Sequence, residues 1–203
     1  MKRRFTWPAL LLASSVLLCG CAPVDSFFPL YKPEDKAFEP ELIGVWKIPD
    51  KDAKNKDDKD SRWTFRGSAD QNFYDFKWGI VRAKGGLLAK VRLVRLDSAL
   101  FIDFEGDSEN KALNSKNTLM PFPIVAVHMM GRIWLEGDTL RIHFLKDDWV
   151  DDQIKAGSFP LAHVGSGGNT LLTASTDELR KFMLDHADDS EALSDNYTFQ
   201  RTK

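Results

Sequence analysis

The chain has 203 residues, of which 43% are hydrophobic and 29% are charged, and its formal net charge at pH 7 is −2. It is long enough for one domain of ordinary size with its own core. The slight excess of acid argues against nucleic acid as a partner and against an electrostatic contact with a membrane, because both need a surplus of Lys and Arg.

The first segment, residues 1–20, has the pattern of a secretory signal peptide. Three basic residues follow Met1, and a short apolar run (WPALLLASSVLL) extends from Trp7 to Leu18. The run is too short to cross a bilayer, which takes about 20 apolar residues. A basic start, a short apolar run and small residues before a cleavage point are typical of an export signal.

The apolar run ends in Leu18-Cys19-Gly20-Cys21, which resembles the lipobox of bacterial lipoproteins. The resemblance implies that Cys21 receives a diacylglyceryl thioether and that the chain is cut between Gly20 and Cys21. Cys19 stands at the variable position, where Ala, Ser or Thr is commoner, and it is a poor acceptor because Leu18 before it is not small. An ordinary cleaved signal and an uncleaved anchor are the alternatives.

Lipid on Cys21 would hold residues 21–203 on a membrane, because each buried methylene contributes about 0.8 kcal/mol. Ala22 follows the cysteine, and in Gram-negative lipoproteins this resembles the default sorting to the outer membrane, facing the periplasm. With Cys19 removed and Cys21 acylated, the domain has no thiol, no disulfide and no cysteine ligand for a metal. We therefore expect no cofactor and no metal, and a fold held by its apolar core.

Residues 21–40 are expected to form a lipidated tether. They contain four prolines, a density that blocks regular pairing and favours an extended chain. The aromatic residues between the prolines would rest on the membrane surface or dock on the domain, and docking is the favoured alternative. These residues are Phe27, Phe28 and Tyr31.

The folded domain is expected over residues 41–203, and it opens with Gly44-Val45-Trp46. This resembles the Gly-x-Trp motif on the first strand of the lipocalin (calycin) superfamily, which follows a short helical turn. In that superfamily an arginine near the chain end packs over the tryptophan, and Arg201 in the last apolar-aromatic segment matches it. The resemblance implies an antiparallel lipocalin-like barrel. A core tryptophan in another β fold is the alternative.

Period-two alternation of apolar and polar residues predicts half-buried antiparallel strands along the middle of the chain. The clearest hairpin runs from Ile124 to Leu145 and turns at Gly137-Asp138. Its outer face carries His128 and His143, which are too far apart to share a metal and are expected to be isolated surface histidines. The other strands are expected at 41–48, 62–67, 72–81, 87–96, 100–104, 170–172 and 197–201.

Two helices are expected, so the predicted fold is mainly β with a C-terminal helix packed outside the barrel and one further short helix. Residues 146–157 begin with acids and end at Gly157, and Ser175–Glu178 forms a capping box that starts a helix to about Asp188. Residues 50–61 hold five Asp and four Lys, and this predicts a solvated loop or a disordered segment.

The motifs do not favour an enzyme. Gly106-Asp107-Ser108 resembles the start of GDS-type esterases, but no histidine has an aspartate three residues before it. The glycine-rich residues 165–168 lack the Lys-Ser/Thr of a phosphate-binding loop. We therefore expect no catalytic residues.

Two functions remain for a membrane-anchored lipoprotein whose protein partner is unknown. The first is a barrel that binds a small hydrophobic ligand, which an open cavity would favour. The second is a structural or interaction lipoprotein without a ligand, which a filled core and an exposed apolar patch would favour. The chain from Gly44 to Arg201 also resembles a group of small bacterial lipoproteins of unassigned role, through residues 135–141, 147–149, 172–179 and 186–189.

Overall fold

The structure is a computed structural model, and it describes residues 24–35, 37–68, 70, 72–81, 86–106, 126–193 and 197–202. Gly20 and Cys21 of the lipobox and Ser108 of the esterase-like motif lie outside these residues. Within the described ranges, no helix has the length and apolar character needed to span a membrane.

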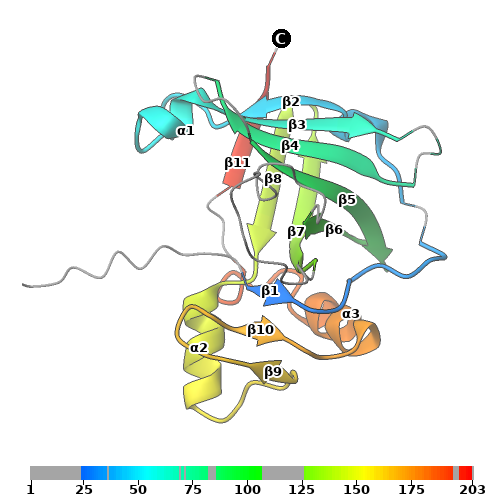
Figure 1. The fold of residues 1–203 in the computed structure, drawn as a ribbon, viewed down its shortest axis with the longest axis vertical. Helices are drawn as coiled ribbons and strands as arrows, with labels where there is room; N and C mark the ends of the chain where they lie inside the picture. Colours follow the sequence, from blue (N-terminus) through cyan, green and yellow to red (C-terminus); the bar gives the residue numbers. More distant parts are fainter. Residues whose placement is uncertain are drawn as a thin grey trace, which may run out of the picture.

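Eight antiparallel strands close into a barrel (Figure 1). They are β2 (Gly44–Lys47), β3 (Ser61–Gly67), β4 (Tyr74–Ile80), β5 (Leu87–Leu96), β6 (Ala99–Gly106), β7 (His128–Glu136), β8 (Thr139–Phe144) and β11 (Tyr197–Arg201). The strands pair in the order β6-β5-β4-β3-β2-β11-β8-β7, and β7 pairs with β6 to complete the ring. The expected lipocalin-like barrel is therefore confirmed as an architecture.

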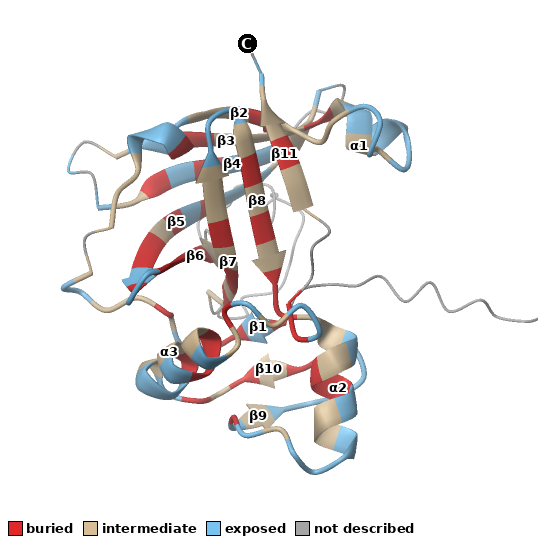
Figure 2. Cartoon of the chain, turned by 180° about the vertical axis from the view of Figure 1, so that it is seen from behind, coloured by how far each residue is buried: buried red, intermediate tan, exposed pale blue. Residues whose placement is uncertain are grey.

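The alternation of the sequence sets which side chains fill the barrel. In the β7–β8 hairpin, Ile133 lies opposite Ile142 and Leu135 opposite Leu140, as the predicted turn requires. Buried and less buried residues alternate along these strands (Figure 2), because successive side chains point to opposite faces. The fully buried inward side chains include Trp46, Phe65, Tyr74, Ile102, Ile133 and Phe199.

A second layer, which we call the basal layer, packs below the barrel in Figure 1. Three short strands, β1 (Asp25–Ser26), β10 (Leu171–Leu172) and β9 (His163–Val164), extend the sheet from β7. Two helices, α2 (Asp147–Lys155) and α3 (Thr176–Asp185), complete the layer. Its core includes outward-facing barrel residues, so these strands are buried on both faces at this end. The barrel residues concerned are Val94, Leu96, Ala99, Phe101 and Met130.

Both predicted outer helices are present, and α3 begins with the predicted capping box. The Ser175 side chain accepts from the Glu178 backbone N–H, and the Glu178 carboxylate accepts from the Ser175 N–H at 2.9 Å. A further short helix, α1 (Lys56–Asp60), was not expected, because its charged sequence has no apolar face. It buries no residue, and the Asn55 side chain caps it by accepting from the Asp58 N–H at 2.9 Å.

The described part of the predicted tether, between Val24 and Pro40, is docked on the domain, and this corrects the expected extended chain. Docking, the favoured alternative for the aromatic residues, holds for Tyr31, which contacts Glu105, but Phe27 and Phe28 are 45% and 41% exposed. Val24 and Leu30 are buried, and β1 pairs with both β7 and β10. The prolines did not prevent this, because the pairing residues, Asp25 and Ser26, lie between Pro23 and Pro29.

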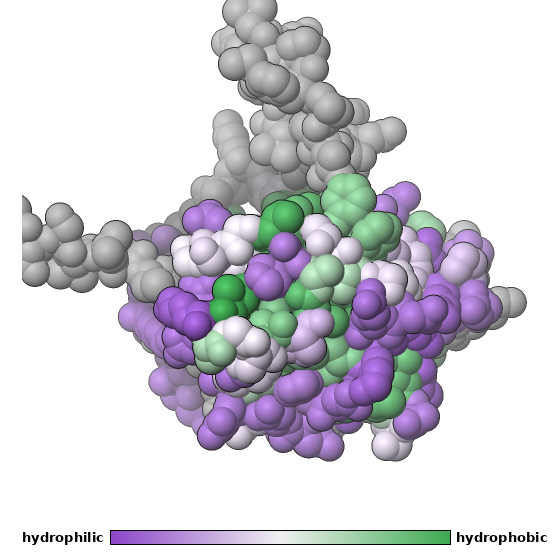
Figure 3. All heavy atoms as spheres, turned by 90° about the horizontal axis from the view of Figure 1, so that it is seen from below, coloured by the Kyte–Doolittle hydropathy of each residue, from purple (hydrophilic) through white to green (hydrophobic). Residues whose placement is uncertain are grey.

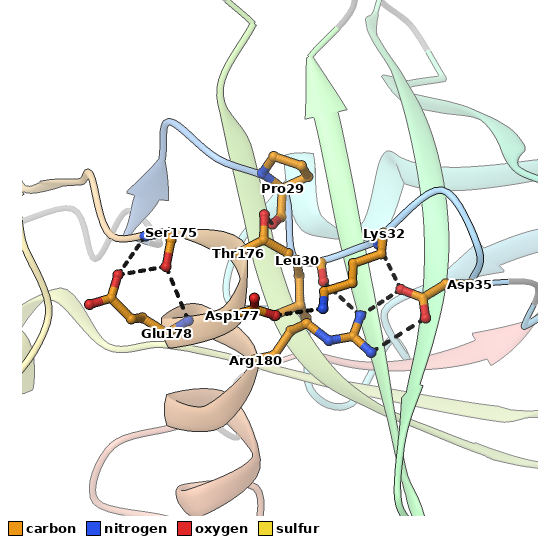
Figure 4. A network of polar contacts seen from close by, with 9 residues as sticks. All are labelled: Pro29, Leu30, Lys32, Asp35, Ser175, Thr176, Asp177, Glu178 and Arg180. Atoms are coloured by element: carbon orange, nitrogen blue, oxygen red, sulfur yellow. Dashed lines mark hydrogen bonds and ion pairs between the residues drawn. The ribbon is translucent and has the colours of Figure 1, made fainter.

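Side chains of α3 hold this segment in place (Figure 4). Thr176 Oγ1 donates to the Pro29 carbonyl at 2.8 Å. The Arg180 guanidinium donates to the Leu30 carbonyl at 3.2 Å and pairs with the Asp35 carboxylate at 2.5 Å. The charged groups are largely buried, at 19% and 14% side-chain exposure, so this ion pair is shielded from solvent.

Replacing Arg180 should loosen the N-terminal segment. We expect Arg180→Gln to lower the free energy of unfolding by about 1.5–3 kcal/mol, the usual value of hydrogen bonds to charged groups. The neighbouring Lys181 pairs with Asp185 on the exposed face of α3, so Lys181→Gln should change it by no more than about 0.5 kcal/mol. Urea-induced unfolding measures both, and equal effects would show that the Arg180 contacts do not hold the segment.

Candidate functional site

One end of the barrel is closed by the predicted signature residues. The 3₁₀ turn η1 (Pro40–Leu42) precedes β2, and β11 pairs Arg201 with Trp46. The Arg201 guanidinium lies 4.3 Å from the centre of the Trp46 ring, so the predicted contact is confirmed. The indole Nε1–H donates to the Leu42 carbonyl at 2.9 Å. The tryptophan is therefore fully buried with its polar atom satisfied.

Arg201 also satisfies backbone carbonyls that the turn leaves open. Its Nη1 donates to the Ile43 carbonyl at 2.7 Å, and its Nη2 donates to the Glu41 carbonyl. Gly44 lies directly beneath the guanidinium, with φ +150°, and a Cβ there would be 2.6 Å from Nη1. Only glycine leaves room for the arginine at this position.

The docked N-terminal segment covers the same end. Phe38 stacks on Tyr74 with ring centres 4.8 Å apart and planes 3° apart. The Tyr74 hydroxyl accepts from the Glu39 N–H at 2.7 Å and donates to the Glu39 carbonyl at 3.1 Å. Burial raises the pKa of Tyr74 to about 12, so the hydroxyl stays protonated and keeps both bonds. The described residues at the Trp46 end therefore cover the interior of the barrel.

The centre of the barrel is filled by aromatic rings. The ring centre of Phe104 lies 5.0 Å from Phe76, 5.8 Å from Trp63 and 5.9 Å from Phe144. These partners belong to β4, β3 and β8, so rings from several strands converge on Phe104. Contacts at these distances are ordinary edge-to-face and tilted packing. A ligand could not pass this level without displacing side chains.

At the opposite end, which we call the mouth, large apolar side chains among the described residues remain exposed. Trp78 of β4 and Leu87 of β5 are register partners that share the inward face. They are 43% and 47% exposed, although their strands point them toward the barrel axis. The Trp78 Nε1–H donates to Ser61 Oγ at 2.8 Å, which fixes the indole at the rim. Partly buried apolar side chains lie deeper, among them Ile48, Trp63, Met129 and Tyr197.

A separate groove of about 460 Å³ runs along the outer face of β3 and β4. Its walls include Arg62, Arg66, Asp75 and Lys77, and Arg66 lies directly opposite Asp75 in the ladder. This groove is solvent-exposed and charged. Apolar side chains, among them Ile80, Val81 and Leu88, also line it, so it mixes charged and apolar groups instead of enclosing a ligand in a mainly apolar pocket.

The environment of His128 differs from the prediction, which was an isolated surface histidine. It is 6% exposed, and its Nδ1 lies 2.8 Å from Oδ1 of the buried Asp103. The other oxygen of Asp103 accepts from the Leu30 N–H at 2.6 Å. The cause is the docked N-terminal segment, which covers this face of the barrel. In the described part of the chain, no three His, Cys, Asp or Glu side chains are grouped so that they could hold a metal ion.

The closed end can be tested by substitutions at its two partners. Trp46→Ala should lower the free energy of unfolding by about 3–5 kcal/mol, because it leaves a cavity in a packed core. Arg201→Lys should lower it by about 1–2 kcal/mol, because lysine cannot stack as a plane and donate to two carbonyls together.

A matched control is Arg141, whose guanidinium lies 5.3 Å from the Trp134 ring at the barrel surface. Arg141→Lys should change the free energy of unfolding by no more than about 0.5 kcal/mol. Denaturant unfolding of the variants gives the comparison. An Arg201→Lys variant as stable as the original would mean that the guanidinium contacts do not support the barrel.

Comparison with known proteins gives no relative for this arrangement. No family model matches the chain, no curated protein matches it, and no solved structure matches its fold. Its function must therefore be inferred from its own residues.

Proposed function

We propose that this chain is a bacterial lipoprotein, anchored by lipid on Cys21 to the outer membrane and facing the periplasm, whose barrel binds a small hydrophobic ligand at its mouth. The lipobox-like Leu18–Cys21 supports the anchor. The observation that carries the ligand site is the half-exposure of Trp78 and Leu87, which face the barrel axis.

Apolar burial is the source of affinity in this proposal. Large apolar side chains that face inward but remain in contact with water gain about 25 cal/mol per Å² when a ligand covers them. The rings around Phe104 lie beneath them and limit the ligand to the mouth. The hydrogen bond from Trp78 to Ser61 fixes the orientation of the indole before a ligand binds, so little side-chain freedom is lost on binding.

Two adjacent leucines of β5 allow binding at the mouth to be distinguished from binding at the outer surface. Leu87 faces inward opposite Trp78, whereas Leu88 faces the outer groove and is 39% exposed. We expect Leu87→Asp to weaken binding of a fluorescent fatty acid such as parinaric acid by about tenfold or more, because burying a leucine contributes about 1.5–3 kcal/mol. Fluorescence titration of the domain purified without its lipid measures the affinity.

Leu88→Asp is the control, and it should leave the affinity unchanged. Both side chains are partly exposed, so both variants should unfold at similar urea concentrations. Equal affinities in the two variants, or equal losses, would contradict a site at the mouth.

The anchor has its own test. Cys21→Ser should block lipid transfer, and because lipid transfer precedes cleavage in lipoproteins, the precursor should stay uncleaved. Labelling of cells with a radioactive fatty acid and measurement of the precursor's size check both steps. Cys19→Ser should be labelled and cut normally. Incorporation of fatty acid into the Cys21→Ser protein would rule out the assignment.

The filled centre favours a second candidate, a structural or interaction lipoprotein without a ligand. Phe65, Phe76, Phe104, Phe144 and Phe199 are all at most 4% exposed, so the centre of the barrel is as well packed as a protein core. Mass spectrometry of the purified domain distinguishes the two candidates. Co-purified lipid supports the first, and a ligand-free domain that also fails to bind the fatty acid supports the second.

A further inference from the structure

The small sheet of the basal layer has one buried face and one exposed face. Its register places Asp25, Leu171 and Val164 side by side. Their chain neighbours Ser26 and Leu172 point the other way and are buried. Successive strand residues alternate between faces, so the side chains in the row of Asp25 lie on the outer face.

This outer face exposes large apolar side chains beside Asp25. Val164 is 55% exposed, and Phe27, two residues after Asp25, is 45% exposed. Phe28 is 41% exposed, and its ring lies 5.2 Å from that of Phe27 in an edge-to-face contact. We call Phe27, Phe28, Val164 and Leu171 the basal patch. Seen from below the molecule, apolar side chains lie among intermediate and hydrophilic ones in the middle of this end (Figure 3).

The place of the patch in the chain indicates what covers it. Val24 is buried in the basal layer and is three residues after Cys21. Three residues span at most about 10 Å. If Cys21 carries lipid, the layer that contains Val24 is held within that distance of the membrane surface. Phe27 follows Val24 by three residues, and β1 (Asp25–Ser26) lies between them.

We propose that the basal patch lies on the lipid bilayer, as a second and non-covalent contact beside the lipid on Cys21. This inference rests on the lipidation in the proposed function. Phenylalanine and aliphatic side chains enter the boundary between headgroups and acyl chains, with an apolar face buried by about 5–10 Å. The two contacts together give the domain one orientation on the membrane.

Charges near the patch define the kind of contact. Asp25 shares its face, and desolvation raises the pKa of this carboxyl. Asp148 and Asp152 are exposed on α2 of the same layer, and Lys155 pairs with Asp152. Acidic groups do not attract anionic lipids, so the contact depends on apolar side chains, and we expect it to be the same on neutral and anionic bilayers.

Single cysteines that carry an environment-sensitive fluorophore test this arrangement in the full lipidated protein. After cleavage the chain has no free thiol, so Val164→Cys and Ile43→Cys each provide one labelling site. Ile43 is 40% exposed next to β2, at the opposite end of the molecule from the basal layer. The protein is reconstituted in vesicles of phosphatidylcholine, with and without phosphatidylglycerol, and fatty-acid labelling confirms the lipid on Cys21.

The expected result is emission at shorter wavelength, with protection from iodide quenching, at position 164 and not at position 43, in both vesicle types. A double variant, Phe27→Ser with Phe28→Ser, should reduce the shift at position 164. If Cys21 carries lipid but the labels at both positions report an aqueous environment, the membrane contact is overturned and the lipoprotein assignment remains intact. Absence of lipid on Cys21 would overturn both.

Discussion

Closure of the barrel by its last strand is the constraint on which the rest of the molecule depends. β11 enters between β2 and β8 and pairs with both, so without it the sheet would have two open edges. The side chain of Arg201 stabilises this closure. Its guanidinium covers Trp46 and satisfies two carbonyls of the preceding turn, and its Nε lies 3.3 Å from Asp138 in the β7–β8 turn. One side chain therefore joins three parts of the barrel's closed end.

The N-terminal segment gives the barrel its second layer. It buries the Asp103–His128 pair and closes the Trp46 end through Phe38 and Tyr74. It also completes the small sheet whose other side is the basal core. A segment that looks like a linker in composition is thus part of both hydrophobic cores. Its ion pair and hydrogen bonds with α3 (Figure 4) fix its path.

Much of the barrel could be predicted from sequence, because period-two alternation and the Gly137-Asp138 turn determine which residues pair and which face inward. The capping box identified α3 for a similar local reason. The strands β1 and β9 could not be predicted, since two residues carry no period. The partners of β1, which are β7 and β10, are also distant from it in the sequence. The burial of His128 was missed because it depends on Leu30, about a hundred positions away. The Trp46–Arg201 contact was predicted from a family resemblance, whereas the exposure of Trp78 could be found only in the structure.

The pairing of β2 with β11 also has a consequence for how the chain reaches its folded state. β2 begins at residue 44, and its partner on one side ends at residue 201, so the ring cannot form until almost the whole chain is present. Contacts between such distant segments are slow to form, because the loop between them must close first. If the chain is exported as proposed, this delay would help it to cross the membrane unfolded, because its first half alone cannot form the closed barrel.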